Sequence, residues 1–334
     1  MRDVLTRLGP LGFGAAQFGN LNVETDDQTC HAAVEAAWGA GIRYFDTAPH
    51  YGLGLSERRL GAALADRPRD QFVVSTKAGR LLEPNPDYRR GDLDDQGFRV
   101  PATSRRRWDF SRDGILRSLE SSLDRLGLDR VDIVYLHDPD EHWESASTTG
   151  VSALIELRDE GVIGAVGVGM NQSAIPARFV AECDIDVVML AGRYTLLDQS
   201  ALDDLLPLAL DRDVAIVAAG VYNSGILSSV HVSDAAAYDY GQAPAELIEH
   251  ARLIAKHAEA IDVTLPEAAV RFPFTHPAVR TVVLGMRTAR HVASGAQRMH
   301  ASVPDALWTD LANSSLIDPR CASTAASPFQ GADS

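Results

Sequence analysis

The sequence contains few cysteines. Only three occur among its 334 residues, at Cys30, Cys183 and Cys321, so they cannot all pair with one another, and they show no CxxC spacing. This pattern excludes a disulfide framework and indicates free thiols in a reducing compartment.

Long apolar runs are also missing. No stretch approaches the roughly 18 uncharged apolar residues of a membrane-spanning helix. At the amino terminus, Asp3 and Arg7 interrupt any apolar region that could belong to a signal peptide. We therefore expect a cytoplasmic protein without a membrane partner.

Basic residues are fewer than acidic ones. The chain has 31 Lys and Arg residues against 46 Asp and Glu residues, which gives a formal net charge of −15. This balance argues against a nucleic-acid partner, because the phosphate backbone attracts basic surfaces. The charges are interspersed, so we interpret the acidity as a source of solubility. The oligomeric state is left open.

Short apolar runs alternate regularly with amphipathic stretches. Residues 72–76, 131–136, 163–168, 186–190, 214–218 and 280–284 read as buried strands, as does the run that ends at Asp46. Helices are expected at 27–39, from Ser56, at 112–126, 149–160, 173–182 and 200–211, and from Thr288.

This alternation predicts an α/β protein, a single (β/α)₈ TIM barrel over residues 1–317. A doubly wound sheet would need a reversal of strand order that no segment marks. Residues 318–334 are rich in Ala, Ser, Pro and Gly, so we expect a mobile tail there.

Residues 80–109 interrupt the pattern, because they show no periodicity. A loop of this length inside a compact domain is usually functional, which favours a lid or a wall of the substrate site. The alternative is a disordered surface insertion.

Four ionisable residues follow the early strands. Asp46, Lys77 and His137 each come at a strand end, and Tyr51 lies five positions after Asp46. The carboxyl ends of parallel strands meet at one face of a barrel, so these side chains should converge. A tyrosine hydroxyl has a pKa near 10, and an adjacent ammonium group held by a carboxylate would lower that pKa. The set suits proton transfer between an alcohol and a carbonyl.

Several segments that surround these four residues resemble the aldo-keto reductases. They are GIRYFDTAPHYGLGLSERRLG, STKAGR, DRVDIVYLHDPD and LRDEGVIGAVGVGMNQ. The resemblance covers about residues 5–315 and implies a barrel with a nicotinamide cofactor across its mouth. It further implies Tyr51 as general acid/base, Lys77 and Asp46 as the pair that tunes it, and His137 as the group that orients the substrate.

The resemblance also implies a cofactor site without a Rossmann fingerprint. The segment from Gly12 to Gln17 only approaches that motif; in the family it is the first barrel loop, where Gly14 and Ala15 would lie under the cofactor. The other implied cofactor contacts are Asn171, Val221, Tyr222, Asn223, Ser224, Gly225, Gly285, Arg287 and Arg290. The Lys that strongly NADP-selective members carry at the last of these segments is missing, and one Arg can serve a 2′-phosphate without excluding NAD. We expect NAD(P), with NAD favoured.

Departures from the general pattern point to a subgroup. Ala191 stands where many members have Gln, Ala219 replaces a common aromatic residue, and Gly295 aligns with a common Asn. These segments resemble family members that oxidise a cyclic hemiacetal: aldose dehydrogenases, such as L-fucose dehydrogenases, and pyridoxal 4-dehydrogenase. Such a sugar or aldehyde substrate would need polar partners, for which His50, Arg193, Tyr222 and Asn223 are candidates, with Trp108 and Phe110 as an apolar wall.

Alternatives stay open at this point. Trp108 can equally serve to pack the long segment, and Arg193 can form a structural ion pair. The run His137–His142 contains possible metal ligands, but Pro139 prevents the helix that would align them, so we expect no metal. A general aldehyde/ketone reductase and a non-catalytic nicotinamide sensor remain as further functions.

Overall fold

Eight parallel strands close into a barrel, as the sequence predicts. The computed structural model describes residues 3–239 and 241–322. The barrel strands are β1 (Leu11–Gly14), β2 (Tyr44–Asp46), β3 (Val73–Ala78), β6 (Ile133–His137), β7 (Ala165–Met170), β8 (Val187–Ala191), β9 (Ala215–Ala219) and β12 (Val279–Gly285). They pair in the order β1-β12-β9-β8-β7-β6-β3-β2, and β2 returns to β1.

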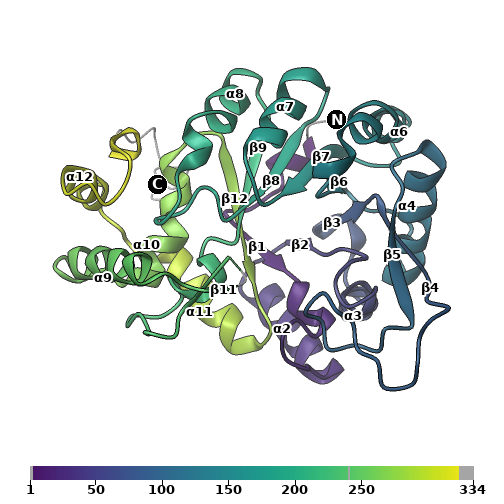
Figure 1. Ribbon diagram of the computed structural model, residues 1–334, viewed down its shortest axis with the longest axis horizontal. Helices are drawn as coiled ribbons and strands as arrows, with labels where there is room; N and C mark the ends of the chain where they lie inside the picture. The colour runs from purple at the N-terminus through teal and green to yellow at the C-terminus, as the bar shows by residue number, and fades with distance from the viewer. Residues whose placement is uncertain (1–2, 240, 323–334) are drawn as a thin grey trace.

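Helices cover the outside of this barrel (Figure 1). They are α2 (Asp27–Gly39), α3 (Leu55–Leu64), α4 (Arg112–Leu126), α5 (Trp143–Ser145), α6 (Val151–Asp159), α7 (Ala174–Glu182), α8 (Leu205–Asp211), α9 (Ala245–Glu259), α10 (Leu265–Arg271), α11 (Ala289–His300) and α12 (Ala306–Asn313). The short helix α1 (Asp3–Thr6) instead contributes Val4 to the apolar cluster of the barrel interior. The helix predicted over 200–211 is divided into a 3₁₀ turn, η5 (Ser200–Leu202), and α8.

Two apolar layers hold the barrel together. Its interior contains Tyr44, Tyr135, Val187 and Val217, which are all buried. The second layer lies between the strands and the helices. Strands such as β3 and β6 are therefore buried on both faces. This explains why the strands read as continuous apolar runs rather than as alternating ones.

Local signals fix the helix ends. The Ser111 side chain accepts a hydrogen bond from the Gly114 amide at the start of α4, and Gly127 ends that helix at a φ of 63°. A serine side chain commonly caps the first turn of a helix, and a glycine in the left-handed conformation commonly ends the last turn. The predicted range 112–126 is therefore confirmed.

The segment expected to be the first barrel loop contains a strand instead. Residues Leu11–Gly14 form β1 and pair with both β12 and β2. Its two glycines weaken the strand signal, but the barrel requires them: a Cβ at Gly12 would lie 2.6 Å from the Tyr44 ring, and one at Gly14 would lie 3.1 Å from the Leu284 carbonyl oxygen.

The long segment after β3 is ordered. It contains an antiparallel hairpin of β4 (Arg80–Pro84) and β5 (Ser104–Trp108), which lies outside the barrel. A second short hairpin, β10 (Ala237–Tyr238) with β11 (Gly241–Gln242), follows β9. The interpretation of residues 80–109 as a disordered insertion is therefore wrong.

The start of the expected mobile tail is packed against the barrel. Residues Pro319–Ala322 form the 3₁₀ helix η8, and Cys321 is fully buried. Arg320 donates to the Leu202 carbonyl at 2.9 Å. Residues 323–334 of the expected tail lie outside the described residues.

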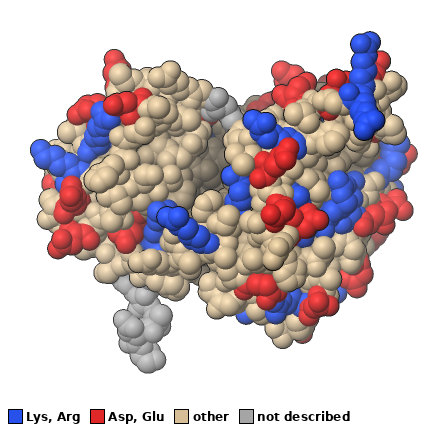
Figure 2. Space-filling model, turned by 90° about the horizontal axis from the view of Figure 1, so that it is seen from below, with Lys and Arg blue, Asp and Glu red and all other residues tan. Residues whose placement is uncertain are grey.

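The charged residues are mixed on the surface (Figure 2), as their distribution along the sequence indicates. Basic and acidic side chains are interspersed on the face shown in Figure 2. Within the part of the chain that the structure describes, no helix is both long and apolar enough to cross a membrane.

Candidate active site

Three of the four predicted catalytic residues form one buried contact. The Lys77 Nζ atom donates to Asp46 Oδ2 at 2.7 Å and to the Thr47 carbonyl at 3.0 Å. It also lies 4.8 Å from the centre of the Tyr51 ring. The register of β2 and β3 brings these residues together, because both strands end at the same face of the barrel.

Burial and neighbouring charges shift the pKa values of Tyr51 and Lys77 in opposite directions. Burial raises the pKa of Tyr51 above its usual value, whereas Lys77 lowers that pKa by its charge and a hydrogen bond. Burial acts to lower the pKa of Lys77, but Asp46 and Tyr51 outweigh burial and raise it. Lys77 is therefore a fixed ammonium group, and its charge opposes the rise that burial causes in the pKa of Tyr51.

A chain of hydrogen-bonded hydroxyl groups holds the Asp46 carboxylate. It was not predicted from the sequence. The Ser75 hydroxyl donates to Asp46 Oδ1 at 2.7 Å. The Tyr44 hydroxyl lies 3.0 Å from the Ser75 hydroxyl and 3.1 Å from that of Tyr135. Both Asp46 oxygens thus have partners, so the carboxylate keeps one orientation. The signal in the sequence was the polar residues at inward-facing positions of β2, β3 and β6.

His137 joins the site as predicted. Its ring lies 5.9 Å from that of Tyr51, in an edge-on arrangement. Burial lowers the pKa of His137 well below its usual value, and Arg80 and Lys77 lower it further. The imidazole is therefore neutral, so one ring nitrogen can donate a hydrogen bond while the other accepts.

A second histidine lies beside it. The ring of His50 is 5.5 Å from the ring of His137, and burial lowers the pKa of His50 as well. The Nδ1 atoms of both rings are buried and have no hydrogen-bond partner among the described residues. Two neutral imidazoles thus border one space.

These residues surround a cavity of about 210 Å³, which we call the catalytic cavity. Its lining includes the predicted residues His50, Tyr51, Lys77, His137 and Asn171. Sequence reasoning missed Gln96, Phe98 and Met189, which also line it. Phe98 packs on Tyr51 at 6.1 Å between ring centres, although it comes from the long segment after β4. Polar groups at one end and apolar walls elsewhere are typical of a small-molecule site.

Two further cavities lie beside β9 and β12. One of about 500 Å³ is lined by Tyr222, Gly285 and Arg290 among the predicted residues, and by Arg298, which was not predicted. The other, of about 190 Å³, is lined by Asn171, Asn223 and Ser224, and also by Arg193. The second shares Asn171 and Ala191 with the catalytic cavity.

This set fits a nicotinamide dinucleotide. Two guanidinium groups and the hydroxyls of Ser228, Ser229 and Ser294 line the larger cavity, which suits phosphate and ribose oxygens. Asn171 presents an amide next to the catalytic cavity, and the Asn223 amide oxygen is buried without a described hydrogen-bond partner. The residues thus provide anion-binding groups at one end and amide partners near Tyr51.

Several predicted contacts lie away from these cavities. Gly14, Ala15, Val221 and Gly225 line none of the three, and Gly225, at a φ of 103°, ends the 3₁₀ turn Asn223–Gly225. Arg287 donates to the Leu21 carbonyl at 2.7 Å.

The other residues predicted to contact the substrate, Phe110, Trp108 and Arg193, lie in different surroundings. Phe110 is a core residue that is 3% exposed, and it packs over Gly79. Trp108 stays 37% exposed and borders a different cavity. Arg193 forms ion pairs with Asp198 and Asp239 at 3.4 and 3.0 Å, as its structural alternative proposed.

The segment from His137 to His142 shows no metal centre. Asp138 pairs with Arg80, while His142 packs against Trp108 at 5.2 Å between ring centres. Within residues 3–239 and 241–322, His, Cys, Asp and Glu side chains form no group of three that could hold a metal ion.

Comparisons with known proteins agree with this geometry. Residues 10–313 match the Aldo/keto reductase family. The chain is 48% identical to a D-threo-aldose 1-dehydrogenase of Pseudomonas sp over 92% of this chain and 94% of that one. It is 37% identical to a pyridoxal 4-dehydrogenase of Microbacterium luteolum over the same shares.

Solved structures show the same barrel. The holo form of an aldo-keto reductase from Bacillus halodurans aligns with a TM-score of 0.68 at 25% identity, covering 89% of this chain and 88% of that one. A glycerol dehydrogenase from Gluconobacter oxydans aligns with a TM-score of 0.71 at 23% identity, covering 93% and 94%. The match over nearly the whole chain leads to one conclusion: this protein is an oxidoreductase of the aldo/keto reductase family.

Proposed function

We propose that this enzyme oxidises the cyclic hemiacetal of an aldose, such as L-fucose, to a lactone with NAD(P)⁺. The observation that carries the proposal is the 48% identity to a D-threo-aldose 1-dehydrogenase over 92% of the chain. The position of Tyr51, Lys77 and His137 around one cavity supports it, and Asp46 binds Lys77 from behind that cavity's lining.

In this reaction Tyr51 accepts the proton of the anomeric hydroxyl. Lys77 stabilises the phenolate that accepts this proton, and Asp46 holds Lys77 in place. Neutral His137 donates a hydrogen bond to the substrate oxygen and orients it. When bound, the nicotinamide supplies the hydride acceptor for the hydrogen on the same carbon. The C–H and O–H bonds break as the lactone C=O bond forms.

Cofactor choice follows from the cavity beside β12. Arg290 and Arg298 line it, but Arg298 already donates to the Tyr222 hydroxyl at 2.9 Å and to the Ser228 carbonyl at 3.1 Å. Arg290 is then the cation available to a 2′-phosphate. A single such cation tolerates NADP without requiring it, so we propose use of both cofactors with NAD preferred.

Pyridoxal oxidation is the second candidate, favoured by the 37% identity to a pyridoxal 4-dehydrogenase. It uses the same chemistry, since pyridoxal also forms a cyclic hemiacetal. A panel of L-fucose, D-arabinose, L-galactose, pyridoxal and a simple aldehyde, each with NAD and NADP, separates the candidates. The highest kcat/KM should fall on an aldose; a higher value for pyridoxal would reverse the assignment, and reduction of the simple aldehyde alone would indicate a general carbonyl reductase.

The Tyr51→Phe variant separates catalysis from a sensing role. It should bind cofactor as the wild type does and lose turnover, because only the reacting hydroxyl is removed. A wild-type protein that binds cofactor but forms no NADH with any member of the panel would instead support a nicotinamide sensor. Chelators should leave activity unchanged, and a cytoplasmic location stays a prediction.

A further inference from the structure

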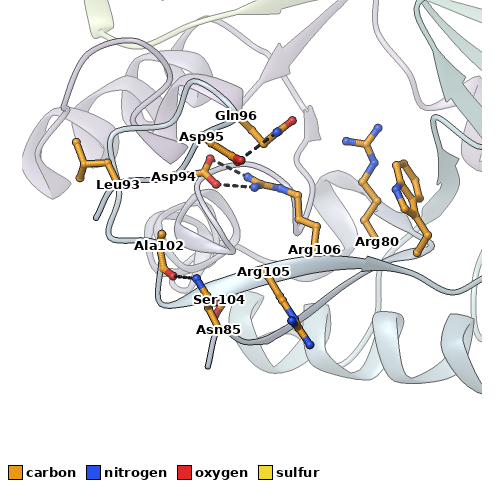
Figure 3. A pocket seen from close by; sticks show the side chains of 11 residues that line it. Arg80, Asn85, Leu93, Asp94, Asp95, Gln96, Ala102, Ser104, Arg105 and Arg106 are labelled. Carbon is orange, nitrogen blue, oxygen red and sulfur yellow. Dashed lines mark hydrogen bonds and ion pairs between the residues drawn. The ribbon is translucent and has the colours of Figure 1, made fainter. Parts of the chain in front are cut away.

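A second cavity lies between the β4–β5 hairpin and the segment that connects the two strands. Its volume is about 430 Å³, and its lining includes Arg80, Asp94, Gln96, Ser104, Arg106 and Trp108 (Figure 3). We call it the hairpin cavity. Ligand cavities range from about 300 to 1,000 Å³, so it falls within that range, whereas the catalytic cavity of about 210 Å³ is smaller.

The hairpin cavity adjoins the catalytic cavity. Gln96 lines both of them. Arg80, from the wall of the hairpin cavity, forms an ion pair with Asp138, which lines the catalytic cavity. The two cavities are therefore neighbours, with Gln96 in the lining of each.

One wall of the hairpin cavity is built by buried polar contacts. Arg106 donates to both oxygens of Asp94, at 2.5 and 2.9 Å, and the two side chains are only 12% and 4% exposed. The same guanidinium donates to the His50 carbonyl at 3.0 Å. Arg80 lies over the Trp108 ring at 4.2 Å. These contacts fix the shape of the hairpin cavity relative to His50 and the catalytic residues.

The cofactor does not account for this space. The cavities that fit it lie beside β9, β12 and α11, and they share no lining residue with the hairpin cavity. In Figure 1 the β4–β5 hairpin lies on the side of α3 and α4, away from α9 and α11. The hairpin cavity is thus on the other side of the catalytic residues.

Charge balance favours a neutral ligand. The guanidinium groups of Arg80 and Arg106 each have a carboxylate partner, in Asp138 and Asp94. The remaining cation, Arg105, is exposed, and its side chain points away from that of Arg106 in Figure 3. An anion would meet little unbalanced positive charge. Amide, hydroxyl, carboxylate and guanidinium groups side by side instead suit a neutral ligand with several hydroxyls.

We propose that the hairpin cavity is a second sugar subsite, which holds a neutral sugar unit attached to the aldose that is oxidised. The enzyme then acts on the reducing end of a disaccharide as well as on a free monosaccharide. This inference rests on the proposed aldose oxidation, and it adds that the substrate extends from the catalytic cavity past Gln96 into the hairpin cavity.

A matched pair of tryptophan variants tests the proposal. Ser104 lines the hairpin cavity at the start of β5, so Ser104→Trp should fill it. Thr103, the preceding residue, is exposed and does not line the cavity, so Thr103→Trp adds the same bulk outside it. Neither residue belongs to the catalytic cavity.

The substrates are L-fucose and a series of disaccharides with L-fucose at the reducing end, linked through different hydroxyls. For at least one linkage, wild-type kcat/KM should equal or exceed that for L-fucose. Ser104→Trp should lower kcat/KM for that disaccharide by about tenfold or more, equivalent to about 1.4 kcal/mol, and leave L-fucose oxidation unchanged. Thr103→Trp should alter neither.

Calorimetric titration of the same disaccharide into each protein makes the result independent of turnover. Weaker binding to Ser104→Trp than to Thr103→Trp supports the subsite. Equal affinities, or no binding of any disaccharide to the wild type, would overturn it. A wild-type protein that oxidises no sugar would refute the proposed function instead, and the titration would still decide whether the hairpin cavity binds sugar.

Discussion

Replacing Lys77 with methionine removes the cation that opposes the burial of Tyr51. Burial alone raises the pKa of the Tyr51 hydroxyl, so the phenolate becomes rarer at neutral pH when Lys77 is lost. Each unit of pKa increase reduces the phenolate population about tenfold at pH values below the pKa. Since general base catalysis contributes about 10²–10⁴-fold, kcat for oxidation near neutral pH should fall within that range.

The same substitution affects stability. Lys77 and Asp46 are bonded at 2.7 Å, and their side chains are only 2% and 4% exposed. Removing one partner of such a buried pair costs about 3–5 kcal/mol. The double variant Asp46→Asn/Lys77→Met removes both charges, so it should regain most of the unfolding free energy while activity stays low. This comparison separates catalytic loss from unfolding.

The assay is the pH profile of kcat, with pre-steady-state kinetics to establish that hydride transfer limits the rate. In the wild type the oxidation rate should rise toward alkaline pH, because the reaction needs deprotonated Tyr51. In Lys77→Met this rise should move to higher pH, since the pKa of Tyr51 increases. A variant that loses activity but keeps the wild-type midpoint would refute the role of Lys77 in tuning Tyr51. A wild-type rate that is flat from neutral to alkaline pH would refute Tyr51 as the base.

Three further substitutions test other contacts. Arg125→Met removes the 2.6 Å ion pair of the fully buried Glu57 carboxylate, which should lower the free energy of urea unfolding by about 3–5 kcal/mol. Because burial raises the pKa of Glu57, this loss of stability should become smaller at acidic pH. A loss that is independent of pH would contradict the argument. Arg290→Ala should raise KM for NADP by about tenfold and for NAD much less, because a charge-assisted hydrogen bond contributes about 1.5–3 kcal/mol; equal changes would show that Arg290 does not contact the 2′-phosphate. Gly61→Ala places a Cβ 1.9 Å from the Leu126 carbonyl oxygen and should cost about 1–3 kcal/mol, which an unchanged Tm would rule out.

Parts of the site were predictable because they depend on short stretches of sequence. The apolar runs that end at Asp46, Lys77 and His137 are strands buried on both faces, and their ends fall at one face of the barrel by topology alone. The boundaries of α4 were predictable for a similar reason, since Ser111 and Gly127 act on the adjacent backbone.

Other parts depend on residues that are distant in sequence. The arginine-rich stretch Ser104–Trp108 has no apolar alternation, and it becomes a strand because it pairs with β4 across a long connection. Arg80 and Asp138 are 58 positions apart, and no local pattern indicates that they pair. Phe98 reaches the ring of Tyr51 only because that connection folds back over the barrel mouth.

The sequence by itself thus determined the barrel and the convergence of Asp46, Tyr51, Lys77 and His137 at its mouth, since strand ends and burial follow from local periodicity. The tertiary structure decided what surrounds them. It buried His50 beside His137, which makes both imidazoles neutral, and it placed the Ser75 hydroxyl on Asp46. It also formed the hairpin cavity next to Gln96. These features arise from packing between distant segments, and packing of that kind leaves no periodic signal in the chain.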